Sequence, residues 1–191
     1  MEEFNKFIDY FKEDNKTHIQ YKAVFNLLFY TGMWIGELEA LTLNDIDFTA
    51  RTININKTYQ RVAGKDLIGP PKTVSSNRTI AVPEFVLDRL QEYIDVLYEP
   101  DQDIRIFMHS REAFAKMMKK VAPVQGVKII RIHDLRHSHA SHLIEMGFNP
   151  LVIQERLGHK NIEITLNTYS HLYPHKQQEV ADKLNNLLRP N

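Results

Sequence analysis

The sequence contains no cysteine, so disulfide bridges and thiolate metal sites are excluded. It also lacks any apolar run approaching the ~20 residues of a membrane-spanning helix. The acidic start, MEEFNKFIDYFKED, does not resemble a secretion signal. We therefore expect a soluble cytoplasmic protein with no membrane partner. With 191 residues, 43% of them hydrophobic, the chain can bury one good core, either as a single domain or as a domain with a small appendage.

The chain also lacks a net charge at neutral pH, because its 24 basic residues balance its 24 acidic ones. A net charge of zero argues weakly against a nucleic-acid partner. The charges are nevertheless unevenly spread. From Arg51 to Arg78 there are six basic residues and one acidic residue, Asp66, and eight of the nine histidines lie at or after His109. Basic charge gathered in this way suits a surface that follows phosphates. An ordinary scatter of surface charge explains the same counts equally well.

Most of the chain has the apolar spacing of helices. This spacing covers residues 1–41 and returns after Pro83. A short helix is predicted over residues 150–157 and closed by Gly158, and Asn161 is placed to cap the next helix, which runs through Thr168. An amphipathic tail helix is indicated by the apolar residues Val180, Leu184, Leu187 and Leu188.

The segment between these helical regions has the pattern of a β-hairpin. A strand is predicted over residues 52–59, a turn at 63–65 and a returning strand over 78–82. The two prolines before Lys72 cannot lie in a central strand, so Lys72 is expected on a loop or edge beside the hairpin. The predicted fold class is mostly α with a small antiparallel β-sheet (α+β), formed by residues 1–191 as one domain.

Five side chains in the sequence are of the types needed to attack a DNA phosphate with a phenol and no metal. They are Lys72 in PPKTVSSNR, His133 and Arg136 in HDLRHSHA, His159 in LGHKN, and Tyr169 in TLNTYSH. Such a reaction needs a nucleophile, cations that stabilise the pentavalent phosphorus, and an acid for the leaving oxygen. Two residues three apart on a helix share a face, so His133 and Arg136 can point at one phosphate. Each residue alone has an ordinary structural explanation, and only their joint occurrence favours the catalytic one.

Four segments of the chain resemble the catalytic domain of tyrosine recombinases, and within that family the integrases of phages and conjugative transposons. These segments are TGMWIGELEALTLNDID, PPKTVSSNRTIAVP, HDLRHSHASHLIEMG and LGHKNIEITLNTYSH. The likeness runs in order from about residue 10 to residue 175. It implies the tyrosine recombinase fold and site-specific DNA recombination without a cofactor or a metal. The implied partners are double-stranded DNA recombination sites and other copies of the chain in a DNA-bound synaptic tetramer.

The resemblance also implies a role for each of the five residues. Tyr169 would form a 3′-phosphotyrosyl link, and Arg136 would bind the scissile phosphate. Lys72 would protonate the 5′-oxygen, His133 would accept a proton, and His159 would donate a hydrogen bond to the phosphate. DNA contacts are expected from Lys72, Arg78 and Arg136.

One position departs from the family pattern. The family has an arginine in TGxRxGEL, whereas this chain has Trp34 there and no arginine before Arg51. Loss of one preorganised donor to a developing oxyanion costs roughly 2.7–4 kcal/mol, or about 10²–10³ in rate. Two functions therefore stay open: an impaired recombinase, and a DNA-binding, cleavage-deficient remnant or disabled variant of one.

A zinc site is the alternative within the same segment. Four histidines occur within ten residues, and His133 and His137 have the i, i+4 spacing of zinc-binding helices. The sequence is not HExxH, however, and Arg136 inside the cluster would repel a cation. We expect His137, His139 and His142 to serve in packing, in DNA-backbone contacts or in support of the site.

Relatives carry further N-terminal DNA-binding modules, for which this chain has no room before TGMWIGEL. We therefore expect the chain to be the catalytic part of a longer bacterial protein that is found at the nucleoid when bound to DNA. Residues 176–191, with the tail helix, are expected to fold back on the domain or to exchange between neighbouring protomers.

Overall fold

The computed structural model describes residues 1–71, 73–173 and 177–186 and is mostly helical, which confirms the predicted fold class. The α-helices are α1 Glu2–Ile8, α2 Lys16–Thr31, α3 Ile35–Ala40, α4 Glu84–Asp95, α5 Arg111–Val124, α6 Asp134–Glu145, α7 Pro150–Leu157, α8 Ile162–Tyr169 and α9 Gln177–Asn186. The strands are β1 Ile46–Asp47, β2 Thr52–Ile55, β3 Thr58–Val62, β4 Lys65–Gly69 and β5 Arg78–Ala81. Short 3₁₀ turns cover Leu43–Asp45, Val74–Ser76 and Ser170–Leu172.

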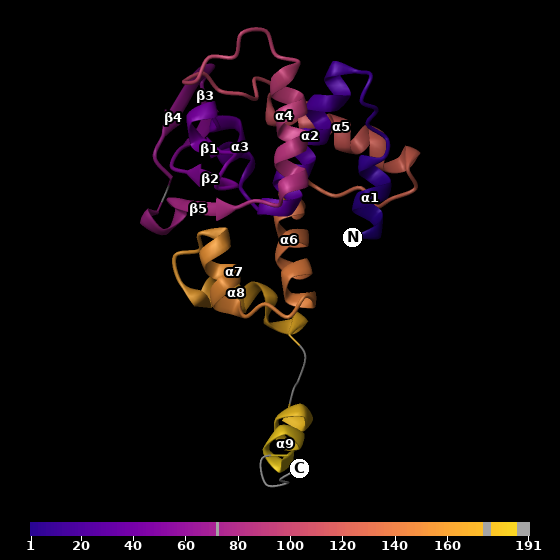
Figure 1. Cartoon of the computed structure of the whole chain (residues 1–191), viewed down its shortest axis with the longest axis vertical. Helices are drawn as coiled ribbons and strands as arrows, with labels where there is room; N and C mark the ends of the chain where they lie inside the picture. The colour runs from indigo at the N-terminus through magenta and orange to yellow at the C-terminus, as the bar shows by residue number, and fades with distance from the viewer. Residues whose placement is uncertain (72, 174–176, 187–191) are drawn as a thin grey trace.

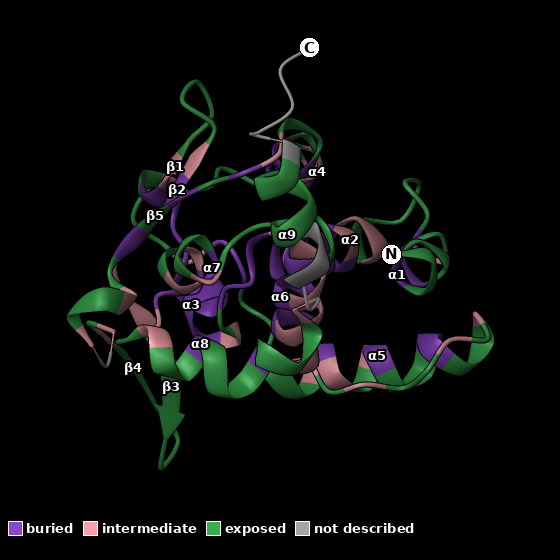
Figure 2. Cartoon of the chain, turned by 90° about the horizontal axis from the view of Figure 1, so that it is seen from below, coloured by how far each residue is buried: buried purple, intermediate pink, exposed green. Residues whose placement is uncertain are grey.

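Helix α2 is the centre of the main core. It begins at Asn15, whose side chain accepts hydrogen bonds from two backbone N–H groups of the first turn, and it ends at Gly32 in the left-handed conformation. From Gln20 to Thr31 it is buried on nearly every side, and the polar Gln20, Asn26 and Thr31 are buried with the apolar residues. Helices α3, α4 and α6 pack against it, and Figure 2 shows that burial is concentrated in this central region.

The strands form two sheets. One has the order β1-β2-β5 and the other is the hairpin β3-β4, and all pairings are antiparallel. The predicted turn at 63–65 is confirmed, with positive φ at Ala63 and Gly64, which suits a tight two-residue hairpin turn. The predicted single strand over 52–59 is wrong, because residues 52–55 pair with β5 while 58–62 pair with β4. The β3-β4 hairpin is largely exposed (Figure 2).

A second, smaller core lies at the C-terminal end of α6. Its buried members come from α6, α7 and α8 and are Ala140, Ile144, Ile153, Leu157 and Tyr169. Helix α6 therefore joins two packing units, because its first turns contribute Leu135 to the main core. Figure 1 shows α7 and α8 together beside α6 and below the sheets. Four residues of the predicted site, His133, Arg136, His159 and Tyr169, lie at this junction.

Helix α9 lies apart from the other helices in Figure 1. Two residues of its predicted apolar stripe, Val180 and Leu184, are exposed, and the other two, Leu187 and Leu188, lie outside the described residues. None of the helices in the described part of the chain is long and apolar enough to cross a bilayer.

Candidate active site

The start of α6 places His133 and Arg136 against the indole of Trp34. The rings of His133 and Trp34 stack with centroids 4.7 Å apart and planes inclined by 11°. The guanidinium carbon of Arg136 lies 4.6 Å from the centroid of the same indole, within the range of a cation–π interaction. Trp34 is nevertheless 44% exposed. The indole therefore covers one side of the histidine and of the arginine while its own outer surface faces solvent.

Arg136 is held by two main-chain carbonyls. Its Nη1 donates to the oxygen of Gly32 at 2.6 Å and its Nη2 to the oxygen of Leu157 at 2.7 Å. The residue is only 3% exposed, and burial lowers its pKa to about 10, which still leaves the guanidinium charged at neutral pH. Two of its five N–H donors are engaged by these carbonyls, and the other three have no hydrogen-bond acceptor among the described residues.

Gly32 is required where α2 meets the smaller core. Its φ is +66°, and a Cβ there would lie 2.6 Å from Cδ2 of His139 and 2.7 Å from Cδ2 of Leu157. The absence of a side chain lets the end of α2 approach α6 and α7 closely. This approach brings the carbonyl of Gly32 within reach of Arg136.

Tyr169 is the last residue of α8 and is 4% exposed. Its hydroxyl lies 2.8 Å from Nδ1 of His137, one residue after Arg136 on α6. Burial raises the pKa of the phenol, and the nearby charge of Arg136 opposes that rise. A phenol held in this way is kept protonated in the resting protein, with a hydrogen-bond partner and a cation close by.

His159 follows the left-handed Gly158 that ends α7, and it lies in the same neighbourhood. Its Nδ1 is 2.8 Å from the hydroxyl of Thr165 on α8. Burial, and then the charges of Arg136 and Arg78, lower its pKa to about 4. His159 is therefore neutral at physiological pH and suited to donating a hydrogen bond rather than to carrying a charge.

A second arginine, Arg78 of β5, is buried in an ion pair. Its two terminal nitrogens each donate to a carboxylate oxygen of Glu37 at 2.9 Å, and its Nε donates to the oxygen of Arg156. Glu37 also accepts from the backbone N–H of Trp34 at 2.8 Å, so the pair fixes the start of α3. We expected Arg78 to contact DNA, but it is 9% exposed and its guanidinium instead links β5, α3 and α7.

Arg156 of α7 makes a third set of links. Its guanidinium donates to Nε2 of His139, to the oxygen of Ala81 and to the oxygen of Tyr30. Since His139 accepts this bond, its ring is unprotonated there, and burial together with the charge of Arg156 lowers its pKa to about 3. The smaller core is thus attached to the main core through the buried Arg78 and Arg136 and the half-buried Arg156.

The basic stretch from Arg51 to Arg78 is largely paired within the chain. Four of its described members form ion pairs: Arg51 with Glu84, Lys57 with Asp45, Arg61 with Asp66, and Arg78 with Glu37. Two of these pairs are exposed and can exchange for phosphate, whereas those of Lys57 and Arg78 are mostly buried. Lys72, the predicted acid, lies outside the described residues.

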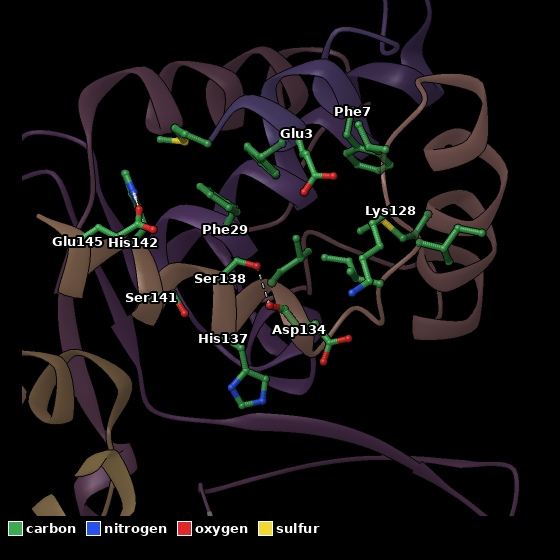
Figure 3. A pocket seen from close by; sticks show the side chains of 17 residues that line it. Glu3, Phe7, Phe29, Lys128, Asp134, His137, Ser138, Ser141, His142 and Glu145 are labelled. Carbon is green, nitrogen blue, oxygen red and sulfur yellow. Dashed lines mark hydrogen bonds and ion pairs between the residues drawn. The ribbon is translucent and has the colours of Figure 1, made fainter. Parts of the chain in front are cut away.

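The four clustered histidines have different partners. His133 stacks on Trp34, His137 contacts Tyr169, and His139 accepts from Arg156, while His142 lies 3.6 Å from Glu145. Figure 3 shows His137 and His142 well apart along the pocket that they both line. Within the described residues no three His, Cys, Asp or Glu side chains are arranged to hold a metal ion. The geometry therefore gives no support to the zinc alternative.

Sequence reasoning missed three residues of this site. His137 was expected to serve in packing, in DNA-backbone contacts or in support of the site, and its contact with the hydroxyl of Tyr169 was not predicted. Glu37 and Arg156 carried no signal of their own in the sequence. Their importance comes from contacts with segments more than 40 residues away.

The chain is similar in sequence to known integrases and tyrosine recombinases. Residues 1–176 match the family described as the phage integrase family. Among curated proteins, the ICEBs1 integrase of Bacillus subtilis is 33% identical over 200 residues, which cover 98% of this chain and 54% of that protein. A XerC-like tyrosine recombinase of Caldanaerobacter subterraneus is 30% identical, covering 92% of this chain and 51% of the relative. The chain thus spans about half the length of these relatives.

Two solved structures are similar to this chain in fold. The integrase of transposon Tn1549, in complex with circular intermediate DNA, superposes with a TM-score of 0.78 at 25% identity, covering 97% of this chain and 64% of that one. The catalytic domain of the bacteriophage HP1 integrase superposes with a TM-score of 0.62 at 21% identity, covering 100% and 95% respectively. The second likeness concerns the fold alone.

Proposed function

The chain belongs to the phage integrase family, and from that membership we propose that it is the catalytic part of a tyrosine-type site-specific DNA recombinase. It cleaves and rejoins double-stranded DNA through a 3′-phosphotyrosyl intermediate. The observation that carries this proposal is the convergence of Tyr169, Arg136 and His159 at the junction of the two cores. Each of these residues comes from a different sequence motif.

The proposed chemistry follows from the contacts of these residues. Tyr169 attacks the phosphorus, and a histidine takes the phenol proton; the family pattern assigns this step to His133. The free donors of Arg136 and the neutral ring of His159 stabilise the charge that develops on the phosphate oxygens. Lys72 supplies a proton to the leaving 5′-oxygen, as the family pattern implies. The new ester to tyrosine conserves the energy of the broken bond, so rejoining needs no nucleotide cofactor.

Trp34 limits this activity. An indole offers one N–H and no charge, against the five donors and the full charge of a guanidinium. The indole, which stands where the family has its arginine, also covers one side of Arg136 and of His133. We propose that the chain binds its DNA and cuts it slowly. The second candidate, a DNA-binding protein that does not cut, is favoured by the same contacts.

The proposed partners of the chain are DNA and further copies of the same protein. The DNA is a pair of recombination sites belonging to a mobile element in a bacterial cell, bound by several copies of the protein in a synaptic tetramer. Residues 176–191 either fold back on their own domain or reach a neighbouring copy. The exposed Val180 and Leu184 suit either arrangement.

The test is a covalent trap. The chain and its Trp34→Arg variant are incubated with nicked duplexes whose sequence is randomised around the nick, and protein-bound DNA is isolated under denaturing conditions. An adduct is expected, weakly for the chain and strongly for the variant, and Tyr169→Phe should abolish it. Tyr173→Phe is the matched control, because its buried hydroxyl has no hydrogen-bond partner among the described residues. An adduct that survives Tyr169→Phe would overturn the assignment. If Trp34→Arg also forms none, the proposed cleavage activity is wrong, and the binding-only function stays as the second candidate.

A further inference from the structure

The hydroxyl of Tyr169 has one hydrogen-bond partner among the described side chains, and that partner is His137. The 2.8 Å distance joins the phenol oxygen to Nδ1, and the two ring centroids are 5.8 Å apart. His133, to which the family pattern assigns proton acceptance, makes no hydrogen bond to Tyr169 in the described part of the chain. Its ring is stacked on Trp34 and meets the ring of His137 edge-on at 4.7 Å.

We propose that His137 is a catalytic residue that accepts the proton of Tyr169 as the phosphotyrosyl bond forms. This inference rests on the proposed function. In this step the phenol oxygen bonds to phosphorus while its proton passes to Nδ1 of His137. The bond from phosphorus to the 5′-oxygen breaks, and that oxygen takes a proton from the leaving-group acid. On rejoining, both proton transfers run in reverse.

The surroundings of His137 suit this role. Its ring is half-buried and borders a pocket of about 540 Å³ between α1, α6 and residues 127–130, so water can reach it (Figure 3). The charged and titratable groups near it are His133 and Asp134 on α6, Tyr169 on α8, and His159. An acceptor at Nδ1 requires the neutral ring to carry its hydrogen on Nε2. In that form the ring receives the phenol proton directly.

The first experiment tests the contact without DNA. Nitrogen NMR of histidine-labelled chain is compared with its Tyr169→Phe variant. The Nδ1 resonance of His137 is expected to shift on loss of the hydroxyl, while that of His142 on the same helix stays in place. A shift at His133 with none at His137 would overturn the proposal.

The second experiment separates proton acceptance from positioning. In the Trp34→Arg background, His137→Asn keeps a hydrogen-bond acceptor near the place of Nδ1 but cannot take up a proton, and His137→Phe has neither property. Both are expected to slow single-turnover cleavage by at least ~10²-fold, the usual contribution of general base catalysis. His142→Asn is the matched control and is expected to react at the parent rate. Thermal melting establishes that each variant is folded.

The outcomes are distinguishable. If His137→Asn cleaves at the parent rate and His137→Phe does not, the residue only positions the phenol and the proposal is wrong. If both cleave at the parent rate, the proposal is wrong while the proposed function stands. If the parent protein, Trp34→Arg, forms no adduct, then the proposed function and the role of His137 are both wrong.

A modified substrate identifies which proton is involved. Replacing the leaving 5′-oxygen by sulfur removes the need for an acid, because a thiolate leaves unprotonated. The rate loss in His137→Asn should persist on this substrate, since His137 acts on the nucleophile. Full recovery on the sulfur substrate would mean that His137 serves the leaving group instead, which contradicts the proposal.

Discussion

The imidazole of His133 stacks on the indole of Trp34 with a centroid separation of 4.7 Å, and the same indole lies over the guanidinium of Arg136. Two groups expected to face a phosphate are thus covered by a residue that can replace little of a guanidinium's charge or hydrogen bonding. The backbone of Trp34 is itself fixed by Glu37, so the position is well ordered whatever its side chain.

Trp34→Arg should speed single-turnover cleavage of nicked DNA by at least ~10²-fold, because it restores a charged donor set beside the developing oxyanion. Trp34→Leu is the control that removes the indole without adding a cation, and it should give little gain. If leucine accelerates the reaction as much as arginine does, then the indole acts as a steric block and the missing charge is unimportant. Melting temperature should change much less, because Trp34 lies outside both buried cores.

The single tryptophan of the chain should report the protonation of His133. A protonated imidazole in contact with an indole quenches its fluorescence. Burial, followed by the charges of His137 and Arg136, lowers the pKa of His133 below its usual value of about 6.5. Emission should therefore be full at neutral pH and fall as the pH drops through a midpoint below about 6.5. The titration should vanish in His133→Asn, and a midpoint above 6.5 would contradict the burial of this ring.

Glu37→Gln should lower the free energy of unfolding by about 3–5 kcal/mol, because it leaves the buried Arg78 without its counter-charge. Urea unfolding measures this change. The control is Glu84→Gln, which removes the exposed partner of Arg51 and should cost at most ~1 kcal/mol. A double replacement, Glu37→Gln with Arg78→Met, should recover part of the loss. If the two single replacements lower the free energy of unfolding equally, then the Glu37–Arg78 pair stabilises the fold no more than a surface ion pair does.

Arg156→Lys should loosen the smaller core, because an ammonium cannot reproduce three bonds from one planar guanidinium. Hydrogen exchange should rise at least ~10-fold in peptides covering residues 150–169 and stay unchanged in α2. Arg131→Lys, at the exposed pair with Asp134, serves as the control and should alter neither region. An even rise over the whole chain would mean that the two cores open together.

The predictions that succeeded depend on neighbouring residues. Helices α7 and α8 begin and end within one residue of the predicted positions, because Asn161 and Gly158 act on the turns beside them. The strand prediction over 52–59 failed because the break at residues 56–57 is set by pairing partners elsewhere in the chain. Alternating side chains alone do not reveal such a change of partner.

The sequence indicated which described residues lie near one another, but it did not indicate the contacts that they make. The motifs placed His133, Arg136, His159 and Tyr169 together, and the structure brings them to one junction. The burial of Arg78 against Glu37 was not foreseen, because a basic residue beside other basic residues indicates an exposed surface. Which histidine meets the phenol depends on how α8 packs on α6, and spacing along α6 does not determine that packing.

The arginines that connect the two cores are Arg78 and Arg136, which are buried, and Arg156, which is half-buried. They donate mostly to main-chain oxygens, namely those of Gly32, Leu157, Tyr30, Ala81, Arg156 and Ser76. Every amino acid carries such an oxygen, so these bonds demand a particular path of the backbone and make no demand on the side chain at the accepting position. A substitution at Tyr30 or Ala81 therefore removes no acceptor. The connection between the cores therefore depends on the side chains of the three donating arginines, whereas the hydrogen bonds themselves do not restrict which residue supplies the accepting oxygen.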